Sequence, residues 1–307
     1  MKTPKEKKEQ REKRGIGHFL TPSWQEQYCA AYDELLAEMP KPTNTLDIAT
    51  SWGIVRVYEW KNKDAADKPP VVLLPGRSSG VPMWNENLSS MMANHTVYAA
   101  DALGDAGKSY QSVPFDGYVD MVNWISEMIA ELKIGKVHLV GHSFGGGFAA
   151  NVALGHPEQT VTVSLLEPAF ALNYPSVSIL FWATIGSMAF LPKSWRDYAL
   201  ARMIGEEIKE MESDAPMARM ISAASAGYAA YLPTPKTLSD KEIETLTMPV
   251  YVALGGKSPI TGKKAPKSAR KIKNATIQIF DEATHSLPME YQFEIGEALN
   301  NFWAQNE

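Results

Sequence analysis

The chain has 307 residues, of which 45% are hydrophobic and 10% aromatic, and its formal net charge is -5. This length suits one α/β domain with an inserted segment, and the composition is that of a globular enzyme that can bury a large core. The small negative charge argues against a broad nucleic-acid-binding face, which would have to be basic.

The start of the chain, residues 1–14, consists mostly of Lys and Glu with almost no apolar residue. A charge run of this kind is typical of a solvated, flexible tail, and a basic arm for an anionic partner is the alternative. The segment lacks the apolar stretch of a secretory signal peptide. Because Cys29 is the only cysteine, no intrachain disulfide can form, and a cytoplasmic location is predicted.

From about residue 45, short β-rich runs alternate with helical patterns, which predicts a mostly parallel sheet covered by helices on both faces. Strands are expected at Thr45–Ala49, Ile54–Trp60, Val71–Leu74, Val97–Ala100, Val137–Val140, Thr160–Leu166, Val250–Leu254 and Thr276–Phe280. The first two strands are expected to pair as an antiparallel hairpin at the sheet edge, because only a tight turn separates them. Helices are expected at Tyr118–Leu132, Phe144–Leu154 and Tyr291–Trp303.

Residues 168–245 interrupt this alternation with a stretch rich in Met, Ala and aromatic residues. They are predicted to form a helical cap between the sixth and seventh strands of a core made of residues 15–167 and 246–307. Alternatively, residues 168–245 form helices that only pack on the core and have no role at a functional site. The most apolar part, residues 176–191, is shorter than the ~20 residues of a membrane span, so no stable membrane insertion is expected.

The pentapeptide Gly141-His142-Ser143-Phe144-Gly145 is a G-x-S-x-G motif between a predicted strand and a predicted helix. That context is typical of a nucleophile elbow, a strained turn that lifts a serine hydroxyl above the sheet beside a helix N-terminus. Ser143 is therefore predicted to be a catalytic nucleophile.

A nucleophilic serine needs a base to take its proton, and His285 is the candidate among the six histidines. It follows the last predicted strand, which gives the chain order serine, acid, histidine. His142 is next to the serine but is expected to point away from it on this turn. A packed position inside a strand is expected for His138. The others have no evident partner: His18, His95 and His156.

Together these motifs resemble the α/β-hydrolase superfamily over roughly residues 45–303. The segment Leu73–Arg77 (LLPGR) stands where the family usually has His-Gly and one further residue after the third strand. The resemblance implies an oxyanion hole made by the backbone N–H of Arg77, or of Ser78, together with that of Phe144. The loop Asp101–Ser109 resembles the family's D-x-x-G-x-G-x-S loop, which looks structural.

The resemblance also implies an acid shortly after the strand that precedes the histidine loop, but Ser258 stands there. Losing the carboxylate that orients the histidine can cost about 10⁴ in rate, so the acid has to come from elsewhere. Glu167, at the end of the sixth predicted strand, is the candidate, because some α/β hydrolases carry their acid after that strand. Asp281, Glu282 and Asp105 are the alternatives, and a purely structural role for Glu167 also stays open.

Several aromatic residues are expected either to line an apolar pocket over the nucleophile or to belong to the core: Trp84, Phe144, Phe170, Tyr174, Phe181, Trp182 and Phe190. The residues predicted to contact substrate are Gly76, Ser78, Trp84, His142, Phe170 and Trp182. A surface rich in Met and aromatic side chains suits a bulky apolar acyl or alcohol group. The Arg77 side chain is a candidate for meeting a polar substrate group.

The sequence thus predicts a serine carboxylesterase that forms an acyl-enzyme on a small-molecule ester. No cofactor is expected, because no metal-ligand cluster or dinucleotide-binding loop is evident. Three phrases, FLTPSWQEQYCAAYDELL, DALGDAGKS and SLLEP, resemble bacterial serine-dependent macrolide esterases and favour a large ester or lactone. The alternatives are a low-turnover ligand-binding or signalling protein of the same fold, and a thioester or carbon–carbon bond hydrolase.

Overall fold

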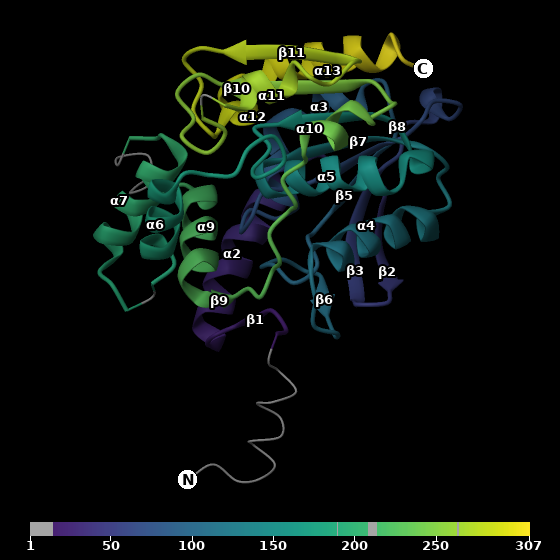
Figure 1. Cartoon of the computed structure of the whole chain (residues 1–307). Helices are drawn as coiled ribbons and strands as arrows, with labels where there is room; N and C mark the ends of the chain where they lie inside the picture. Colours follow the sequence, from purple (N-terminus) through teal and green to yellow (C-terminus); the bar gives the residue numbers. More distant parts are fainter. Residues whose placement is uncertain (1–14, 189, 208–213, 263) are drawn as a thin grey trace.

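A computed structural model of the chain describes residues 15–188, 190–207, 214–262 and 264–307. The predicted tail, residues 1–14, therefore lies outside the described residues. A nine-stranded sheet forms the centre of the fold, in the order β11-β10-β8-β7-β4-β5-β3-β2, with β6 paired to β3 (Figure 1). Its strands are β2 (Asn44–Thr50), β3 (Gly53–Trp60), β4 (Val71–Leu74), β5 (Val97–Ala100), β6 (Tyr110–Gln111), β7 (Val137–His142), β8 (Thr160–Leu166), β10 (Val250–Gly255) and β11 (Ala275–Phe280).

The strands from β11 to β5 are all parallel, and the antiparallel pairs are confined to the end that contains β3. β2 and β3 pair as a hairpin over their whole length, so the expected edge hairpin is confirmed. Each of the predicted strands matches an observed strand to within two residues. The predicted α/β architecture with a mostly parallel sheet is therefore confirmed.

Helices cover both faces of the sheet (Figure 1). On one face lie α4 (Tyr118–Leu132), α5 (Ser143–Gly155), α10 (Asp240–Glu244) and α11 (Ala265–Ala269). On the other face lie α2 (Pro22–Glu38), α3 (Asn85–Met92), α12 (Leu287–Glu290) and α13 (Gln292–Ala304). Successive residues of β7 enter opposite layers, Leu139 the first and Val140 the second, as the two-residue period of a strand requires. All residues of β7 are buried, which holds the end of this strand in a fixed position.

The long helix α2 was not expected from the sequence, although its pattern carries a signal. Thr21 caps it by accepting a hydrogen bond from the backbone N–H of Trp24 at 3.3 Å. Its buried residues are Tyr28, Ala31, Tyr32 and Leu35, at the spacing that puts side chains on one helical face. This face packs on the sheet and on α9 (Pro216–Gly227).

The segment between β8 and β10 contains α6 (Val177–Gly186), α7 (Lys193–Ile204), α9 and the short strand β9 (Tyr228–Ala229), followed by α10. It is helical as expected, and its assignment as a cap stays a prediction. β9 pairs with β1 (His18–Phe19), so this segment is tied to the beginning of the described chain. Among the described residues, no helix is long and apolar enough to cross a membrane.

The contact between α2 and α9 predicts a packing-sensitive glycine. A β-carbon at Gly227 would lie 2.3 Å from Cγ of Trp24, so we expect Gly227→Ala to lower the free energy of unfolding by about 1–3 kcal/mol through overpacking. A β-carbon at Gly155 would meet only Val122, at 3.5 Å. Gly155→Ala is therefore the control and should be neutral or slightly stabilising. Urea denaturation measures both, and equal effects would contradict this account of the interface.

Candidate active site

The turn from β7 to α5 has the geometry of a nucleophile elbow. Ser143 is the first residue of α5 and has φ of 53°, a conformation that few residues other than glycine adopt. A β-carbon at Gly141 would lie 2.4 Å from the carbonyl oxygen of Gly145, and one at Gly145 would lie 2.4 Å from that of Leu74. Both positions therefore require glycine, because the two sides of the turn approach each other at Gly141 and the turn approaches the end of β4 at Gly145.

Ser143 and His285 are brought together from two distant parts of the chain. His285 lies in the loop between β11 and α12, and its Nε2 is 2.7 Å from Oγ of Ser143. The histidine is buried and the serine is half-buried. This is the contact that a serine nucleophile and its base require.

Glu167 lies on the far side of the histidine ring. Its Oε2 is 3.0 Å from Nδ1 of His285, and the carboxylate is fully buried. Its Oε1 accepts hydrogen bonds from the backbone N–H of Gly255 at 2.5 Å and from Oγ1 of Thr261 at 3.0 Å. These donors compensate for the water that the buried carboxylate has lost. The structure therefore joins the three predicted residues in one hydrogen-bonded row.

None of the other acidic candidates reaches the histidine. Asp281 is exposed, and the exposed Glu282 forms an ion pair with Lys257. Asp105 is buried but accepts hydrogen bonds from the backbone N–H groups of Ser78 and Ala106, and burial raises the pKa of its carboxyl.

Ser258, which stands at the usual acid position, is buried in the loop after β10. Its hydroxyl has no hydrogen-bond partner among the described residues. Ser258 therefore does not substitute for a carboxylate in orienting the histidine, although its backbone N–H does bond to the carbonyl oxygen of Gly255.

The loop after β4 passes close to Ser143. A β-carbon at Gly76 would lie 3.4 Å from Cβ of Ser143, so this loop borders the side chain of Ser143. The backbone N–H of Ser78 is donated to Asp105 at 2.8 Å. Ser78 is therefore excluded as the oxyanion donor, and of the two predicted alternatives Arg77 is left. Phe144 is in the first turn of α5, where a backbone N–H has no partner within the helix.

The predicted pocket aromatics do not share one surface. Phe170 packs edge-on against Phe144, with 6.3 Å between ring centroids. Trp182 instead lines a separate cavity of about 360 Å³ between α6, α7 and the loop after β10. Phe181 is 55% exposed.

Trp84 is fully buried in the core layer under α2 and α3, so the prediction that it contacts substrate is wrong. The physical reason is that η2 (Val81–Trp84), a short 3₁₀ turn that precedes α3, turns all of its side chains inward. The cavity that borders the loop after β4 and the start of α5 is small, about 20 Å³, and apolar side chains line most of it.

His142 contacts His285, and this contact was not among the expectations for its side chain, which concerned only Ser143 and the substrate. Its Nε2 is 2.9 Å from the backbone carbonyl oxygen of His285, and the two ring centroids are 5.0 Å apart. Burial, with a smaller contribution from the charge of His285, lowers the pKa of His142 to about 3. The sequence held no signal for this contact, because it depends on how the loop after β11 folds back over the elbow.

Comparison with known proteins agrees with this arrangement. The sequence matches the profile of the alpha/beta hydrolase family over residues 71–295. The chain belongs to this family. An uncharacterised carboxylesterase, nap, of Bacillus subtilis is 24% identical over 90% of this α/β hydrolase and 92% of the relative. The 2-hydroxymuconate semialdehyde hydrolase of Pseudomonas putida is 24% identical over 81% of this chain and 92% of its own.

Solved structures share the fold. A hydrolase of Bacillus subtilis superposes with a TM-score of 0.81 at 23% identity, over 92% of this chain and all of the other. The naproxen esterase of the same organism superposes with a TM-score of 0.78 at 21% identity, over 90% and 97% of the two chains. The predicted superfamily is therefore confirmed, and its carboxylesterase members agree with the prediction of a serine hydrolase.

The low pKa of His142 predicts a pH dependence of stability. In the folded protein His142 stays neutral down to pH of about 3, whereas in the unfolded chain it titrates near its ordinary value of 6.5. Between these values the unfolded state binds more protons, so the free energy of unfolding falls as the pH falls, by up to about 1.4 kcal/mol per pH unit from this residue. Urea denaturation across this range should show a shallower dependence for His142→Gln. Identical slopes for the variant and the wild type would contradict the assignment.

Proposed function

We propose that this α/β hydrolase cleaves carboxylic esters, with Ser143 as nucleophile, His285 as general base and Glu167 as the acid of the triad. One observation carries the proposal, the unbroken row of hydrogen bonds from Oγ of Ser143 through the ring of His285 to the carboxylate of Glu167. The kinship with carboxylesterases supports the same reaction class.

In the proposed reaction, Nε2 of His285 takes the hydroxyl proton of Ser143 while Oγ attacks the ester carbonyl carbon. The backbone N–H groups of Arg77 and Phe144 stabilise the oxyanion that develops on the carbonyl oxygen, and each donor of this kind is worth about 3 kcal/mol. The protonated His285 then gives its proton to the leaving alcohol. Water, activated by the same histidine, finally releases the acid from the acyl-enzyme.

Glu167 is proposed to hold His285 in the tautomer with the proton on Nδ1 and to stabilise the imidazolium that forms during the attack. Its burial favours this role, because a charge is felt more strongly where water is excluded. The hydrogen bonds from Gly255 and Thr261 fix the carboxylate. The carboxylate can then rotate only slightly, so its Oε2 stays directed at the His285 ring.

We propose a bulky, largely apolar ester or lactone as the substrate. Supporting this, Phe144 and Phe170 present aromatic surface at the nucleophile's helix, and the naproxen esterase, whose name indicates an aromatic substrate, shares the fold. In this proposal residues 168–245 form a cap over the site. Large macrolide lactones belong to the proposed class on the strength of the sequence resemblance alone.

Carbon–carbon bond hydrolysis is the second candidate, because the 2-hydroxymuconate semialdehyde hydrolase matches over most of both chains. The low-turnover ligand-binding alternative has lost its main argument. It rested on the missing acid at Ser258, and the carboxylate of Glu167 now lies at the histidine.

Replacing the nucleophile tests the reaction class. We expect Ser143→Ala to lower kcat/KM for p-nitrophenyl esters of short and medium acids by about 10⁴-fold or more, because no covalent intermediate can form. Ser258→Ala is the matched control and should leave the rate nearly unchanged, because that hydroxyl has no partner among the described residues. Wild-type-like activity in Ser143→Ala would overturn the proposal. Turnover of 2-hydroxymuconate semialdehyde by the wild type, without turnover of esters, would favour the second candidate.

Replacing the acid tests the triad. Glu167→Gln keeps the shape of the side chain but removes its charge, and we expect kcat to fall by about 10³–10⁴-fold with KM nearly unchanged. Steady-state kinetics on the same esters measure this split, and circular dichroism checks that the buried amide is tolerated. Full activity in a folded Glu167→Gln variant would assign the acid to another residue.

A further inference from the structure

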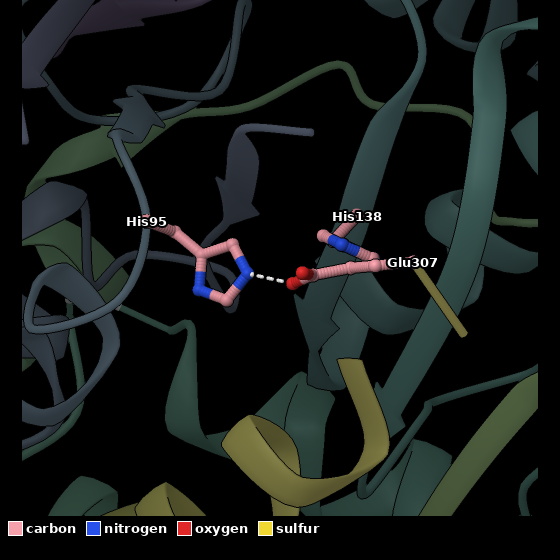
Figure 2. Close-up of side chains that lie close together, drawn as sticks. All are labelled: His95, His138 and Glu307. Atoms are coloured by element: carbon pink, nitrogen blue, oxygen red, sulfur yellow. Dashed lines mark hydrogen bonds and ion pairs between the residues drawn. The ribbon is translucent and has the colours of Figure 1, made fainter. Parts of the chain in front are cut away.

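A second cluster of chemistry-bearing side chains lies away from the candidate active site. His95 is in the turn between α3 and β5, His138 is the second residue of β7, and Glu307 follows α13. One ligand atom from each lies within 4.8 Å of those of the other two. Figure 2 shows the ring of His95 directed at the Glu307 carboxylate, with His138 beside it.

We propose that His95, His138 and Glu307 bind a divalent transition-metal ion, with Zn²⁺ as the best fit. Two imidazole nitrogens and one carboxylate form a ligand set that zinc uses in proteins. Such an ion holds its ligand atoms about 2.0–2.2 Å from itself, and hence about 3.3 Å from each other. The separations of the ligand atoms, at most 4.8 Å, have to shrink by no more than about 1.5 Å to reach that arrangement.

An unpartnered nitrogen is the observation that points to a ligand. His138 is fully buried, and its Nδ1 is 2.8 Å from Oγ1 of Thr162. Its Nε2 has no hydrogen-bond partner among the described residues, which is costly for a buried polar atom. With the proton on Nδ1 donated to Thr162, the lone pair of Nε2 is left free for a metal. A hydrogen bond to the second ring nitrogen is also how proteins orient metal-binding histidines.

The surroundings hold both rings in place. The indole of Trp303 stacks on His138, with ring centroids 5.6 Å apart, and meets His95 edge-on at 5.0 Å. Nε2 of His95 donates its proton to Glu307, whereas Nδ1 is buried with no partner among the described residues. Moving this proton to Nδ1 would leave the lone pair of Nε2 free for the ion.

The Glu307 carboxylate has two nitrogen atoms as partners. Oε1 of Glu307 is 2.7 Å from Nε2 of His95, and its Oε2 is 3.1 Å from Nζ of Lys68. The Lys68 side chain is 39% exposed, so it can turn into water when a metal replaces it. Three protein ligands would leave a coordination position for water.

A metal in this position would join three segments that are far apart in the chain. It would connect the turn before β5, through His95, and the residues after α13, through Glu307, to His138 in β7. His138 lies near the start of β7 and Ser143 directly follows its end. The five residue steps from one position to the other span a distance of about 16 Å in an extended chain. The ion would therefore stabilise the fold without touching the candidate active site, and this inference does not rest on the proposed function.

Zinc binding to the full chain tests the inference. After treatment with a chelator, equilibrium dialysis against Zn²⁺ alone should give one bound ion per chain, and Zn²⁺ should raise the Tm. Co²⁺ in its place should give the visible absorption of a four-coordinate site. We expect Glu307→Gln and His138→Gln to weaken zinc binding at least tenfold. Because Glu307 is at the surface, its variant should fold and keep wild-type ester turnover.

His156→Gln is the matched control, because His156 and Glu158 form a surface histidine–carboxylate pair at 3.5 Å. This variant should bind zinc as the wild type does. The inference is overturned if the wild type binds no zinc. It is also overturned if folded Glu307→Gln binds zinc as tightly as the wild type, since the ion would then be held elsewhere.

Discussion

The close approach of the β7–α5 turn to the end of β4 is the constraint on which the candidate site depends. Glycines at 141 and 145 allow the backbones to meet at distances that no β-carbon would permit. Ser143 is thereby forced to a positive φ, which costs about 1–3 kcal/mol. The surrounding sheet supports this strain, because every residue of β7 is buried between two helical layers. The result is a hydroxyl lifted from the sheet at a fixed point.

The order of the strands explains how the acid can come from β8. This strand lies between β7, which ends next to Ser143, and β10, whose following loop is the usual place of the acid. The carboxylate of Glu167 receives its hydrogen bonds from Gly255 at the end of β10 and from Thr261 in the loop after it. The loop after β10 therefore still takes part in the site, as a donor to the carboxylate instead of its source. The longer Glu side chain spans the difference.

The two ends of β7 carry different chemistry. Its carboxyl end presents Ser143 to the loops that gather at that edge of the sheet, as expected for the ligand-binding edge of a parallel sheet. Its amino end places His138 beside Trp303 and Glu307, under the last helix. Because the strand is buried along its whole length, a stabilising ion at one end would restrain the strand that supports Ser143 at the other.

The sequence by itself determined the parallel sheet, the elbow at Ser143 and the pairing of that serine with His285. The sheet and the elbow depend on local patterns, strand periodicity and glycine spacing, which a short window of sequence contains. The pairing with His285 follows from the order of serine, acid and histidine along the chain, which the resemblance to the family supplies. The sequence also indicates Glu167, because Ser258 stands at the usual acid position and Glu167 ends another predicted strand. Only the tertiary structure excluded the Ser78 N–H as an oxyanion donor, buried Trp84, and turned His142 toward His285. It also brought residues 95, 138 and 307 together. The physical reason is that burial and hydrogen-bond pairing are set by contacts between segments far apart in the chain, and no pattern of neighbouring residues encodes them.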